Sequence, residues 1–570
     1  MKRLAIHLKK YRKDCFLAPL CKLVEALSEL FVPLVVADLI NRGVNGGDKK
    51  VIIVDACVMA ALAFIGLGFS IIGQFFSARA ATGFSSDVRG NLYKKLLSSP
   101  LSETDKMGVS TMVTRMTSDI NQMQNGVNMV LRLLLRSPFV VLGAFVCAAI
   151  IDLKISLVFL ATIVILGIVV AVIMRITMPK YVKAQRMLDD VALTARENLT
   201  GARVIRAFGA EDDEIAAYKK KTAAMEKFQN FTGAISSLLN PITFTIVNLA
   251  IVALLYGGAI RVSSGSLSQG MVIALYDYMS QILIELVKFA NLIVSVSRAL
   301  ACAKRVESVL EIDDEKDCYE GGITSDKYIE FKNVTVRYSD NSTGVKNISF
   351  TVNKGETIGI IGGTGSGKST VVNLLPRLYD ASEGAVFFDG INVKNYPLKE
   401  LRKRIAIALQ RPAIFEGTIR SNVSLDGSAD EKTIETAIEN AQAADVVKSK
   451  TGGLDAPLKQ RGRNLSGGQK QRLSVARALA FGAEVLILDD SSSALDYMTD
   501  LKLRHAIKSL GESLTTIIVS QRASAVRNAD KIIVLGDGEI IGEGTADYLR
   551  ETCEVYREIE ASQMKEGGVR

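Results

Sequence analysis

Hydrophobic residues are concentrated in the first half of the chain, whereas polar and apolar positions alternate in the second half. Six apolar segments lie before about residue 300, near residues 15–41, 51–76, 128–151, 155–178, 232–261 and 270–297. Each reaches or exceeds the roughly 20 residues that a helix needs to cross the hydrocarbon core of a bilayer. After about residue 325, strand-like and helix-like segments alternate with glycine turns, as in soluble α/β domains. The pattern predicts six transmembrane helices followed by a soluble part.

The connections between the apolar segments differ in length and charge. Three are short, but residues 77–127 and 179–231 form long connections rich in lysine and arginine. Basic residues favour cytoplasmic loops, so we expect both long connections and both termini in the cytoplasm. Apolar residues in these connections keep helical spacing, which predicts helices that continue beyond the lipid and turn back near residues 106–108 and 211–214.

Charged residues inside the predicted spans are costly unless they have partners or water. Two groups of polar residues each share one predicted helix face: Lys22, Glu25 and Glu29, and Glu285, Lys288 and Asn291. They would line a water-filled substrate cavity, form ion pairs between helices, or lie where the helices overshoot the hydrocarbon. The sequence leaves these alternatives open.

Overall composition agrees with a membrane protein that has basic cytoplasmic loops. Hydrophobic residues make up 48% of the 570 residues, and the net charge is +9. Basic residues cluster before the first apolar segment, and no stripe of aromatic and basic residues accompanies them, so we expect no nucleic-acid partner. The seven cysteines are scattered without C-x-x-C spacing, which argues against a disulfide framework or a zinc site.

A glycine-rich stretch at residues 359–370, G-I-I-G-G-T-G-S-G-K-S-T, carries the clearest chemistry. It matches the pattern G-x-x-x-x-G-K-S between a predicted strand and a predicted helix. Glycines let backbone N–H groups wrap phosphates at a helix N-terminus; the lysine would reach the β- and γ-phosphates and the serine would ligate Mg²⁺. The candidate binding residues are Gly362, Gly363, Thr364, Gly365, Ser366, Gly367, Lys368, Ser369 and Thr370.

Two further motifs support a nucleotide site. An apolar run at residues 485–488 predicts a buried strand that ends in Asp489, where a carboxylate holds Mg²⁺ through water. The run L-S-G-G-Q at residues 465–469 precedes a predicted helix at residues 470–479 and is a much rarer motif than a phosphate loop.

With these motifs, nearly the whole chain resembles a half-transporter of the ABC exporter family. The resemblance implies an α-helical membrane domain of six transmembrane helices with long cytoplasmic extensions, fused to an α/β P-loop nucleotide-binding domain with a helical subdomain. We expect the membrane domain at residues 1–310 and the ATP-binding domain at residues 328–570. Residues 311–327, which are charged and contain Gly321 and Gly322, would be the linker.

The resemblance also assigns roles to single residues. Tyr338 matches the aromatic residue that stacks on adenine, and Gln410 matches the glutamine that joins the Mg²⁺ site to the membrane helices. Asp496 closes the loop at residues 493–496 that couples two ATP sites. The signature that meets the ATP of a partner chain comprises Leu465, Ser466, Gly467, Gly468 and Gln469, at a helix N-terminus that favours phosphate.

Two positions depart from the family pattern. Asp490 stands where the family has a glutamate that polarises the attacking water, and its side chain is one methylene shorter. Gln521 stands where the family has a switch histidine, and glutamine carries no charge. We therefore expect ATP to bind at Lys368, Ser369 and Asp489 but to be hydrolysed slowly, with an intact signature left to serve a partner.

The sequence thus favours one subunit of a heterodimeric exporter in the plasma (inner) membrane, with ATP and Mg²⁺ as cofactors and a second half-transporter as partner. Amphipathic or lipophilic small molecules are the substrates expected from the family. Other readings remain open: a homodimeric exporter, an importer with an exporter fold, such as one for an iron carrier, or a nucleotide-gated regulatory subunit without transport.

Overall fold

The structure is a computed structural model that describes residues 2–318, 324–338, 343–511 and 513–567. The remaining residues, which include Gly321 and Gly322 of the expected linker, lie outside the described residues. The described chain divides into two compact units. Unit 1 contains residues 1–97 and 109–312, and unit 2 contains residues 98–108 and 313–570. A short segment from the first half of the sequence therefore belongs to the same unit as the phosphate loop.

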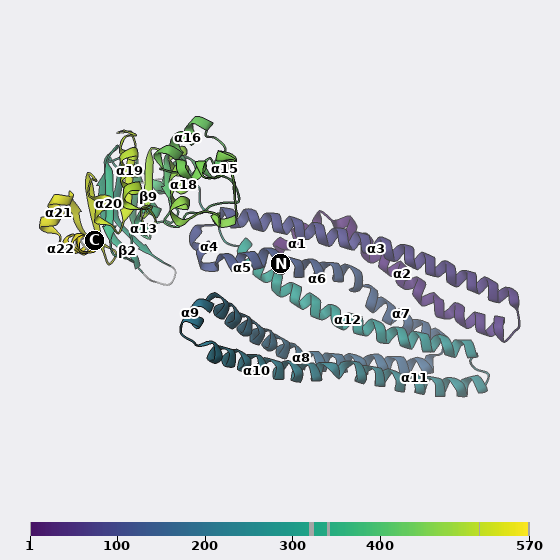
Figure 1. Cartoon of the computed structure of the whole chain (residues 1–570). Coiled ribbons are helices and arrows are strands. Elements are labelled where there is room, and N and C mark those ends of the chain that lie inside the picture. Colours follow the sequence, from purple (N-terminus) through teal and green to yellow (C-terminus); the bar gives the residue numbers. More distant parts are fainter. Residues whose placement is uncertain (1, 319–323, 339–342, 512, 568–570) are drawn as a thin grey trace. The chain divides into compact units, whose positions relative to one another are not determined.

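Unit 1 is helical throughout its described residues (Figure 1). Its helices are α1 (Lys2–Lys9), α2 (Arg12–Asp38), α3 (Lys49–Ser98), α5 (Val109–Thr114), α6 (Ile120–Leu133), α7 (Arg136–Ile151), α8 (Leu153–Thr200), α9 (Ala202–Ala207), α10 (Glu211–Ser237), α11 (Leu239–Ser263) and α12 (Gln269–Leu310). A helical membrane domain was predicted and is confirmed. Helices of 42 to 50 residues, such as α12 and α3, far exceed a bilayer crossing, which confirms the predicted long extensions.

Five described helical segments are long and apolar enough to cross a membrane: residues 49–98, 109–151, 153–200, 211–263 and 269–310. They contain the predicted spans after the first. The first predicted span, residues 15–41, falls mostly within α2, which ends at Asp38, is 27 residues long and carries the charged residues Lys22, Glu25 and Glu29. The count of six spans stays a prediction.

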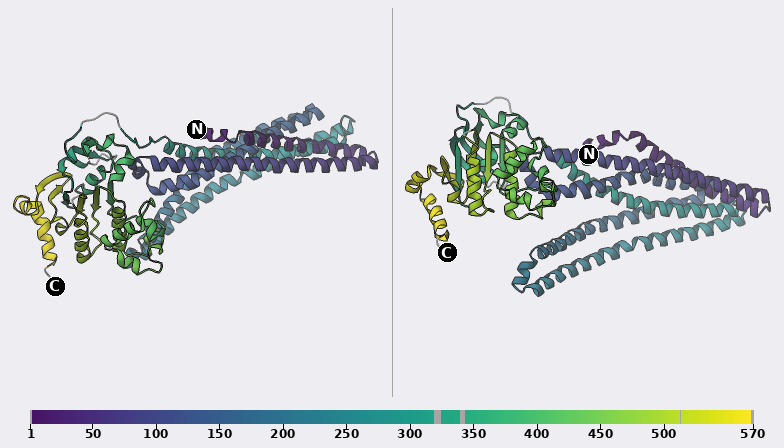
Figure 2. Two further views of the ribbon diagram at one scale, coloured as in Figure 1. Left: turned by 90° about the horizontal axis from the view of Figure 1, so that it is seen from above. Right: turned by 45° about the horizontal axis from the view of Figure 1, so that its top comes forward.

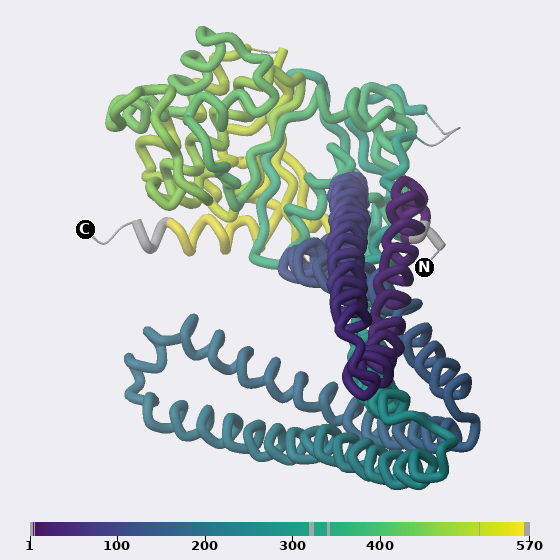
Figure 3. Tube along the Cα trace, turned by 90° about the vertical axis from the view of Figure 1, so that its right-hand side faces the viewer, coloured from purple at the N-terminus to yellow at the C-terminus, as the bar shows by residue number. Residues whose placement is uncertain are grey.

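The second long connection forms a hairpin between α8 and α10, closed by the short helix α9. Figures 2 and 3 show this hairpin turned away from α2 and α3 of the same unit. The chain reverses at residues 201–210, slightly before the predicted point at residues 211–214. The first reversal surrounds α4 (Leu101–Met107), which ends beside the predicted point at residues 106–108. Gly108 follows α4 with a φ of 73°, a left-handed conformation that glycine adopts without strain.

Buried ion pairs link three helices of unit 1. Arg136, at the start of α7, donates to Glu285 of α12 at 2.6 Å and to Glu29 of α2 at 2.6 and 2.7 Å. Lys22 donates to Glu25 at 2.5 Å, and Lys288 donates to Glu285 at 2.8 Å. The charged residues identified in the sequence therefore form ion pairs. Their central partner, the arginine of α7, was missed because its carboxylates lie more than a hundred positions away.

Unit 2 is built on two sheets, as predicted for an α/β domain. The larger sheet has the strand order β12-β11-β3-β10-β9-β6 and is parallel except for β12. Its strands are β3 (Thr357–Gly362), β6 (Ile405–Ala408), β9 (Val485–Asp489), β10 (Thr515–Ser520), β11 (Lys531–Gly536) and β12 (Glu539–Gly544). The antiparallel sheet has the order β2-β1-β4-β5, from β1 (Ile329–Arg337), β2 (Thr343–Val352), β4 (Glu383–Phe388) and β5 (Ile391–Asn392).

Helices of unit 2 pack around these sheets, and a short ladder joins β7 (Gly417–Thr418) to β8 (Pro457–Leu458). The helical subdomain comprises α15 (Ile419–Val423), α16 (Glu431–Asn440), α17 (Ala444–Lys448) and α18 (Gly467–Ala480). The other helices are α4, α13 (Lys368–Leu374), α14 (Leu398–Arg404), α19 (Tyr497–Lys508), α20 (Ala523–Val526), α21 (Ala546–Thr552) and α22 (Glu554–Gly567).

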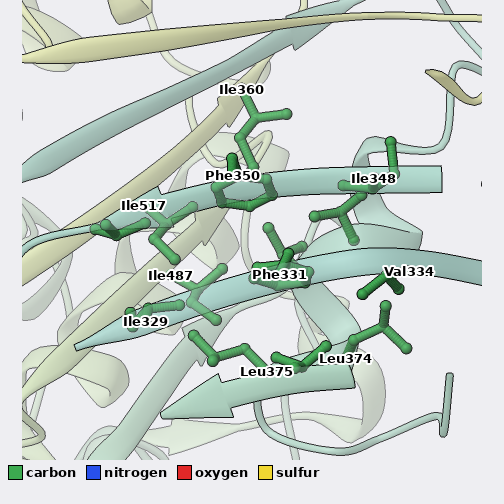
Figure 4. Packing of buried hydrophobic residues seen from close by; sticks show 14 of the residues in the cluster. Ile329, Phe331, Val334, Ile348, Phe350, Ile360, Leu374, Leu375, Ile487 and Ile517 are labelled. Atoms are coloured by element: carbon green, nitrogen blue, oxygen red, sulfur yellow. The ribbon is translucent and has the colours of Figure 1, made fainter. Parts of the chain in front are cut away.

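The core of unit 2 fixes the helix that follows the phosphate loop. Figure 4 shows Leu374 and Leu375 beside the apolar side chains of β1 and β9. Phe331 and Phe350 stack with ring centroids 4.4 Å apart and bind β1 to β2. Because this core is buried on all sides, it holds α13 and the strand before it in place, and so positions the loop between them.

Removal of Arg136 should destabilise unit 1 far more than removal of Lys288. Arg136→Ala leaves the buried Glu285 and the nearby Glu29 without their main partner, which costs about 3 kcal/mol in comparable buried pairs. Lys288 is 44% exposed, so Lys288→Ala should cost less than about 1 kcal/mol. Thermal unfolding of the purified full chain measures both changes. Equal melting temperatures for the two variants would contradict the ion-pair interpretation.

Candidate functional site

The phosphate loop joins β3 to α13, as the sequence predicted. Its two fixed glycines are required for different physical reasons. A Cβ atom on Gly362 would lie 2.2 Å from the carbonyl oxygen of Leu535, so close approach of two backbones excludes a side chain. Gly367 has a φ of 93°, and a Cβ there would lie 2.4 Å from Val345. Gly363 has neither constraint.

The lysine of the phosphate loop is held by the backbone of the same loop. Lys368 Nζ donates to the carbonyl oxygens of Gly362 at 2.9 Å and Gly363 at 2.6 Å. Burial lowers the pKa of Lys368, whereas the charges of Asp489 and Asp490 raise it, and the net direction is downward. The ammonium group is therefore desolvated and gains from an anion such as a phosphate.

Ser369 and Asp489 form the corner in which a Mg²⁺ ion would be held. Ser369 Oγ donates to Asp489 Oδ1 at 3.0 Å. Hydroxyl and carboxylate oxygens are ligands that Mg²⁺ accepts, and the two groups converge here from α13 and β9. Burial raises the pKa of the Asp489 carboxyl, and the neighbouring charge of Asp490 adds to the rise. A divalent cation would relieve this excess of buried negative charge, so these residues fit the ion.

Asp490 follows the end of β9 in a strained backbone conformation. Its φ is 45°, and its N–H donates to the carbonyl oxygen of Val519 at 2.9 Å. The side chain accepts a hydrogen bond from Gln410 Nε2 at 3.2 Å. Burial raises the pKa of the Asp490 carboxyl, although Gln410, Lys368 and Arg522 oppose the rise. The structure thus brings two sequence-predicted residues, Asp490 and Gln410, into direct contact.

Gln521 lies next to the loop on its other side. Its Oε1 accepts a hydrogen bond from Thr364 Oγ1 at 3.4 Å, and its carbonyl oxygen accepts one from Gln563 at 2.8 Å. The next residue, Arg522, was missed in the sequence. Its guanidinium donates to the carbonyl oxygens of Ser492 and Ser493 at 3.5 and 3.3 Å. Arg522 directly follows Gln521, the residue that departs from the family pattern, and this position was a signal that could have identified it.

Tyr338 reaches the helix that follows the phosphate loop. Its hydroxyl lies 2.7 Å from Thr370 Oγ1, and its side chain is 39% exposed. Tyr379 meets it edge-on, with ring centroids 6.4 Å apart, and donates to Asp105 of α4 within unit 2. An exposed aromatic face beside the loop can stack on a base.

The signature forms the N-terminus of α18 in a preformed capping box. Ser466 Oγ accepts from the N–H of Gln469 at 3.3 Å, and Gln469 Oε1 accepts from the N–H of Ser466 at 3.0 Å. A Cβ on Gly468 would lie 2.9 Å from the carbonyl oxygen of Ala494, whereas a Cβ on Gly467 would lie 4.0 Å from the Cβ of Ala494, an ordinary contact distance. Asp496 caps α19 by accepting from the N–H of Thr499 at 2.9 Å. Leu465 is buried beneath the motif.

The predicted site residues therefore fall into two groups. One surrounds the phosphate loop, and the other consists of the signature and the loop that ends at Asp496. Among the described residues, no hydrogen bond joins the signature to the phosphate loop. Each group lies at the N-terminus of a helix, where backbone N–H groups can bind phosphate.

Family comparisons match both parts of the chain. Residues 15–286 match the family described as ABC transporter transmembrane region, and residues 345–493 match the family described as ABC transporter. The chain is 34% identical to an uncharacterized ABC transporter ATP-binding protein, YfiB, of Bacillus subtilis, with 100% of this chain and 99% of the relative covered.

More distant relatives carry functional names. The chain is 30% identical to a probable multidrug resistance ABC transporter ATP-binding/permease protein, YheH, of Bacillus subtilis, over 86% of this chain and 74% of the relative. It is 29% identical to an ATP-dependent lipid A-core flippase of Hahella chejuensis, over 99% and 97%. A solved bacterial Atm1-family ABC exporter with ATP bound is 22% identical, with a TM-score of 0.82 and coverage of 97% of this chain and 98% of that one. The last likeness shows the fold.

Alanine substitutions should separate the two kinds of glycine in the phosphate loop. Gly367→Ala forces a side chain into a left-handed conformation and against Val345, so we expect at least about a tenfold loss of ATP affinity. Gly363→Ala meets nothing within 4 Å and should bind ATP as the native chain does. Fluorescent-nucleotide titration of the purified chain measures both. Equal losses would show that the loop tolerates no side chain anywhere.

Asp490→Asn should stabilise the nucleotide-free chain at neutral pH. The native pKa of Asp490 lies above its unfolded value, so ionisation costs stability; the cost is complete above the native pKa and disappears as the pH falls to the ordinary carboxyl range. The melting temperature of the variant should exceed that of the native chain at pH 8 in EDTA, and the difference should shrink as the pH is lowered towards the ordinary carboxyl range. Asp426→Asn is the control, because the pKa of this exposed carboxyl is lowered and its loss brings no gain.

Proposed function

Because this chain belongs to the ABC transporter family, we propose that it is one half of an ATP-driven exporter whose own phosphate loop binds ATP but hydrolyses it slowly. The proposal rests on one juxtaposition: Asp490 and Gln521 flank the phosphate loop at the positions where the family has glutamate and histidine. The loop itself keeps every residue required for binding, with Lys368 held beside Asp489 and Asp490. Firm binding without rapid hydrolysis is the expected result.

In this proposal each residue of the site has a separate task. Lys368 and the loop N–H groups hold the β- and γ-phosphates, Ser369, Asp489 and Gln410 hold Mg²⁺ directly or through water, and Tyr338 stacks on adenine. Bound Mg²⁺ neutralises charge on the phosphate oxygens. Asp490 would orient the attacking water but falls short by one methylene, and misplacement on this scale costs on the order of a hundredfold in rate. Gln521 would accept or donate a hydrogen bond without carrying charge.

A second subunit would complete the site. Among the described residues the signature makes no hydrogen bond to the chain's own phosphate loop, so we propose that the helix N-terminus capped by Ser466 and Gln469 meets the ATP held by a partner half-transporter. The tip of the α8–α10 hairpin carries two large apolar side chains that are mostly exposed, Leu199 at 79% and Phe208 at 83%. Exposed apolar side chains at such a tip suit docking to another subunit.

Because of Asp490 and Gln521, the two ATP sites of the proposed dimer would differ in their rates of hydrolysis. The partner would supply glutamate and histidine, and this chain would supply the signature to the partner's ATP. Closure of the two ATP-binding domains around nucleotide would bias the membrane domains between inward-facing and outward-facing states. The assembly would lie in the plasma (inner) membrane with both termini in the cytoplasm. Relatives named as a lipid A-core flippase and a multidrug resistance transporter support amphipathic or lipophilic substrates.

Restoring the family residues should accelerate ATP hydrolysis by the purified chain. Asp490→Glu extends the carboxylate by one methylene towards the attacking water, and we expect turnover to rise by about tenfold to a hundredfold, with a further rise when Gln521→His is added. Steady-state phosphate release at saturating ATP measures the effect. Lys368→Ala should abolish hydrolysis and serves as the blank.

The oligomer is tested separately. A partner half-transporter with glutamate and histidine at the matching positions should raise ATP turnover and drive solute flux when reconstituted with this chain in vesicles. Rapid turnover by the native chain alone, unchanged by Asp490→Glu, would refute the slow-site proposal. Accumulation of solute on the side of the ATP-binding domain would indicate import.

A further inference from the structure

An apolar groove of about 540 Å³ opens between α11 and α12 in unit 1. Figure 1 shows these two helices side by side. The wall of the groove is formed by Phe244 from α11 and by Leu283, Ile284 and Val287 from α12. Its volume falls in the range of pockets that hold small organic ligands.

The polar end of the groove carries one cation. Lys288, with a side chain that is 44% exposed, is the only charged residue among those lining the groove. The exposed amide of Asn240 lies on the opposite wall and offers N–H donors. No acidic side chain is among the described lining residues. The groove therefore combines an apolar body with a positive end.

Lys288 can leave its present partner at little cost. It donates to Glu285 Oε1 at 2.8 Å, but the same carboxylate accepts from Arg136 at 2.6 Å and from Ser137 at 2.7 Å. Glu285 itself is only 3% exposed, so a ligand cation entering the groove would not reach it. When Lys288 turns towards an incoming anion, the buried carboxylate keeps two donors.

The backbone is interrupted at the mouth of the groove. Helix α10 ends at Ser237 and α11 begins at Leu239. Pro241 lines the groove and has no N–H, so it cannot donate to the carbonyl group of Ser237. The interruption therefore lies close in sequence to Asn240 and Pro241, which line the groove together with Lys288.

We propose that this groove binds an anionic amphiphile, with its apolar chain against Phe244, Leu283 and Ile284 and its anionic head group on Lys288. The inference rests on the proposed transport function, of which it specifies the substrate class. Charge complementarity selects the occupant: a neutral lipid would leave the Lys288 ammonium unchanged, and a cationic amphiphile would face it with like charge. Inorganic phosphate would lack the apolar contacts that supply most of the attraction.

The absence of tryptophan from the sequence permits a direct test. Phe244→Trp places a single fluorophore in the groove, and the full chain is reconstituted in phosphatidylcholine nanodiscs without ATP. A brominated dodecyl phosphate should quench this tryptophan saturably. Adding Lys288→Gln should weaken the apparent affinity by about five- to tenfold, and Lys288→Arg should restore it. Thermal unfolding of each variant confirms that the chain remains folded.

Three controls make the result decisive. Leu249→Trp, on the same helix but outside the groove, reports simple partitioning of the probe into the bilayer. A brominated dodecyl trimethylammonium probe should quench weakly and should not respond to Lys288→Gln, and inorganic phosphate should not compete. Equal quenching by both probes, or no effect of Lys288→Gln in the folded chain, would overturn the proposal. Because binding is measured without ATP, failure of transport would leave this result unaffected.

Discussion

The buried charges at the carboxyl edge of the large sheet govern the ATP-binding domain. Lys368, Asp489 and Asp490 are all largely withdrawn from water, and the pKa values of these groups are shifted towards their neutral forms. In the chain alone, one ammonium group faces two carboxylates. In the proposed site, a magnesium nucleotide would bring phosphates to the lysine and a cation to the carboxylates, so binding energy would come from relieving desolvated charge as well as from forming contacts.

Unit 1 also contains buried charges, and they are neutralised by other side chains of the same unit. Arg136 neutralises Glu285 and Glu29 across three helices, and Ser137 satisfies the remaining oxygen of Glu285. Lys288 is the outermost member of this cluster. In both units, therefore, a buried charge is paired with a group that can form an ion pair with a different partner. A membrane transporter can recognise a charged molecule at such a pair.

Local patterns in the sequence were enough to predict much of the fold. The phosphate loop, β9 and the helix after the signature each depend on a few consecutive residues, and the structure has all three elements at the expected positions. Contacts between distant residues could not be predicted. Arg136 meets Glu285 across 149 positions, and Gln410 meets Asp490 across 80. Periodicity carries no information about such pairs, because each helix or strand satisfies its own pattern whichever neighbour it faces.

The capping box of the signature has one more consequence. Ser466 and Gln469 already satisfy each other's backbone groups before any nucleotide arrives, so the turn at the start of α18 is ordered in the isolated chain. In the proposed dimer, a triphosphate would meet a turn that is already formed, and it would need only to replace Gln469 Oε1 as the acceptor of the Ser466 N–H. The signature would then bind the ATP held by the opposing subunit without first becoming ordered, and little conformational entropy of the chain would be lost on binding.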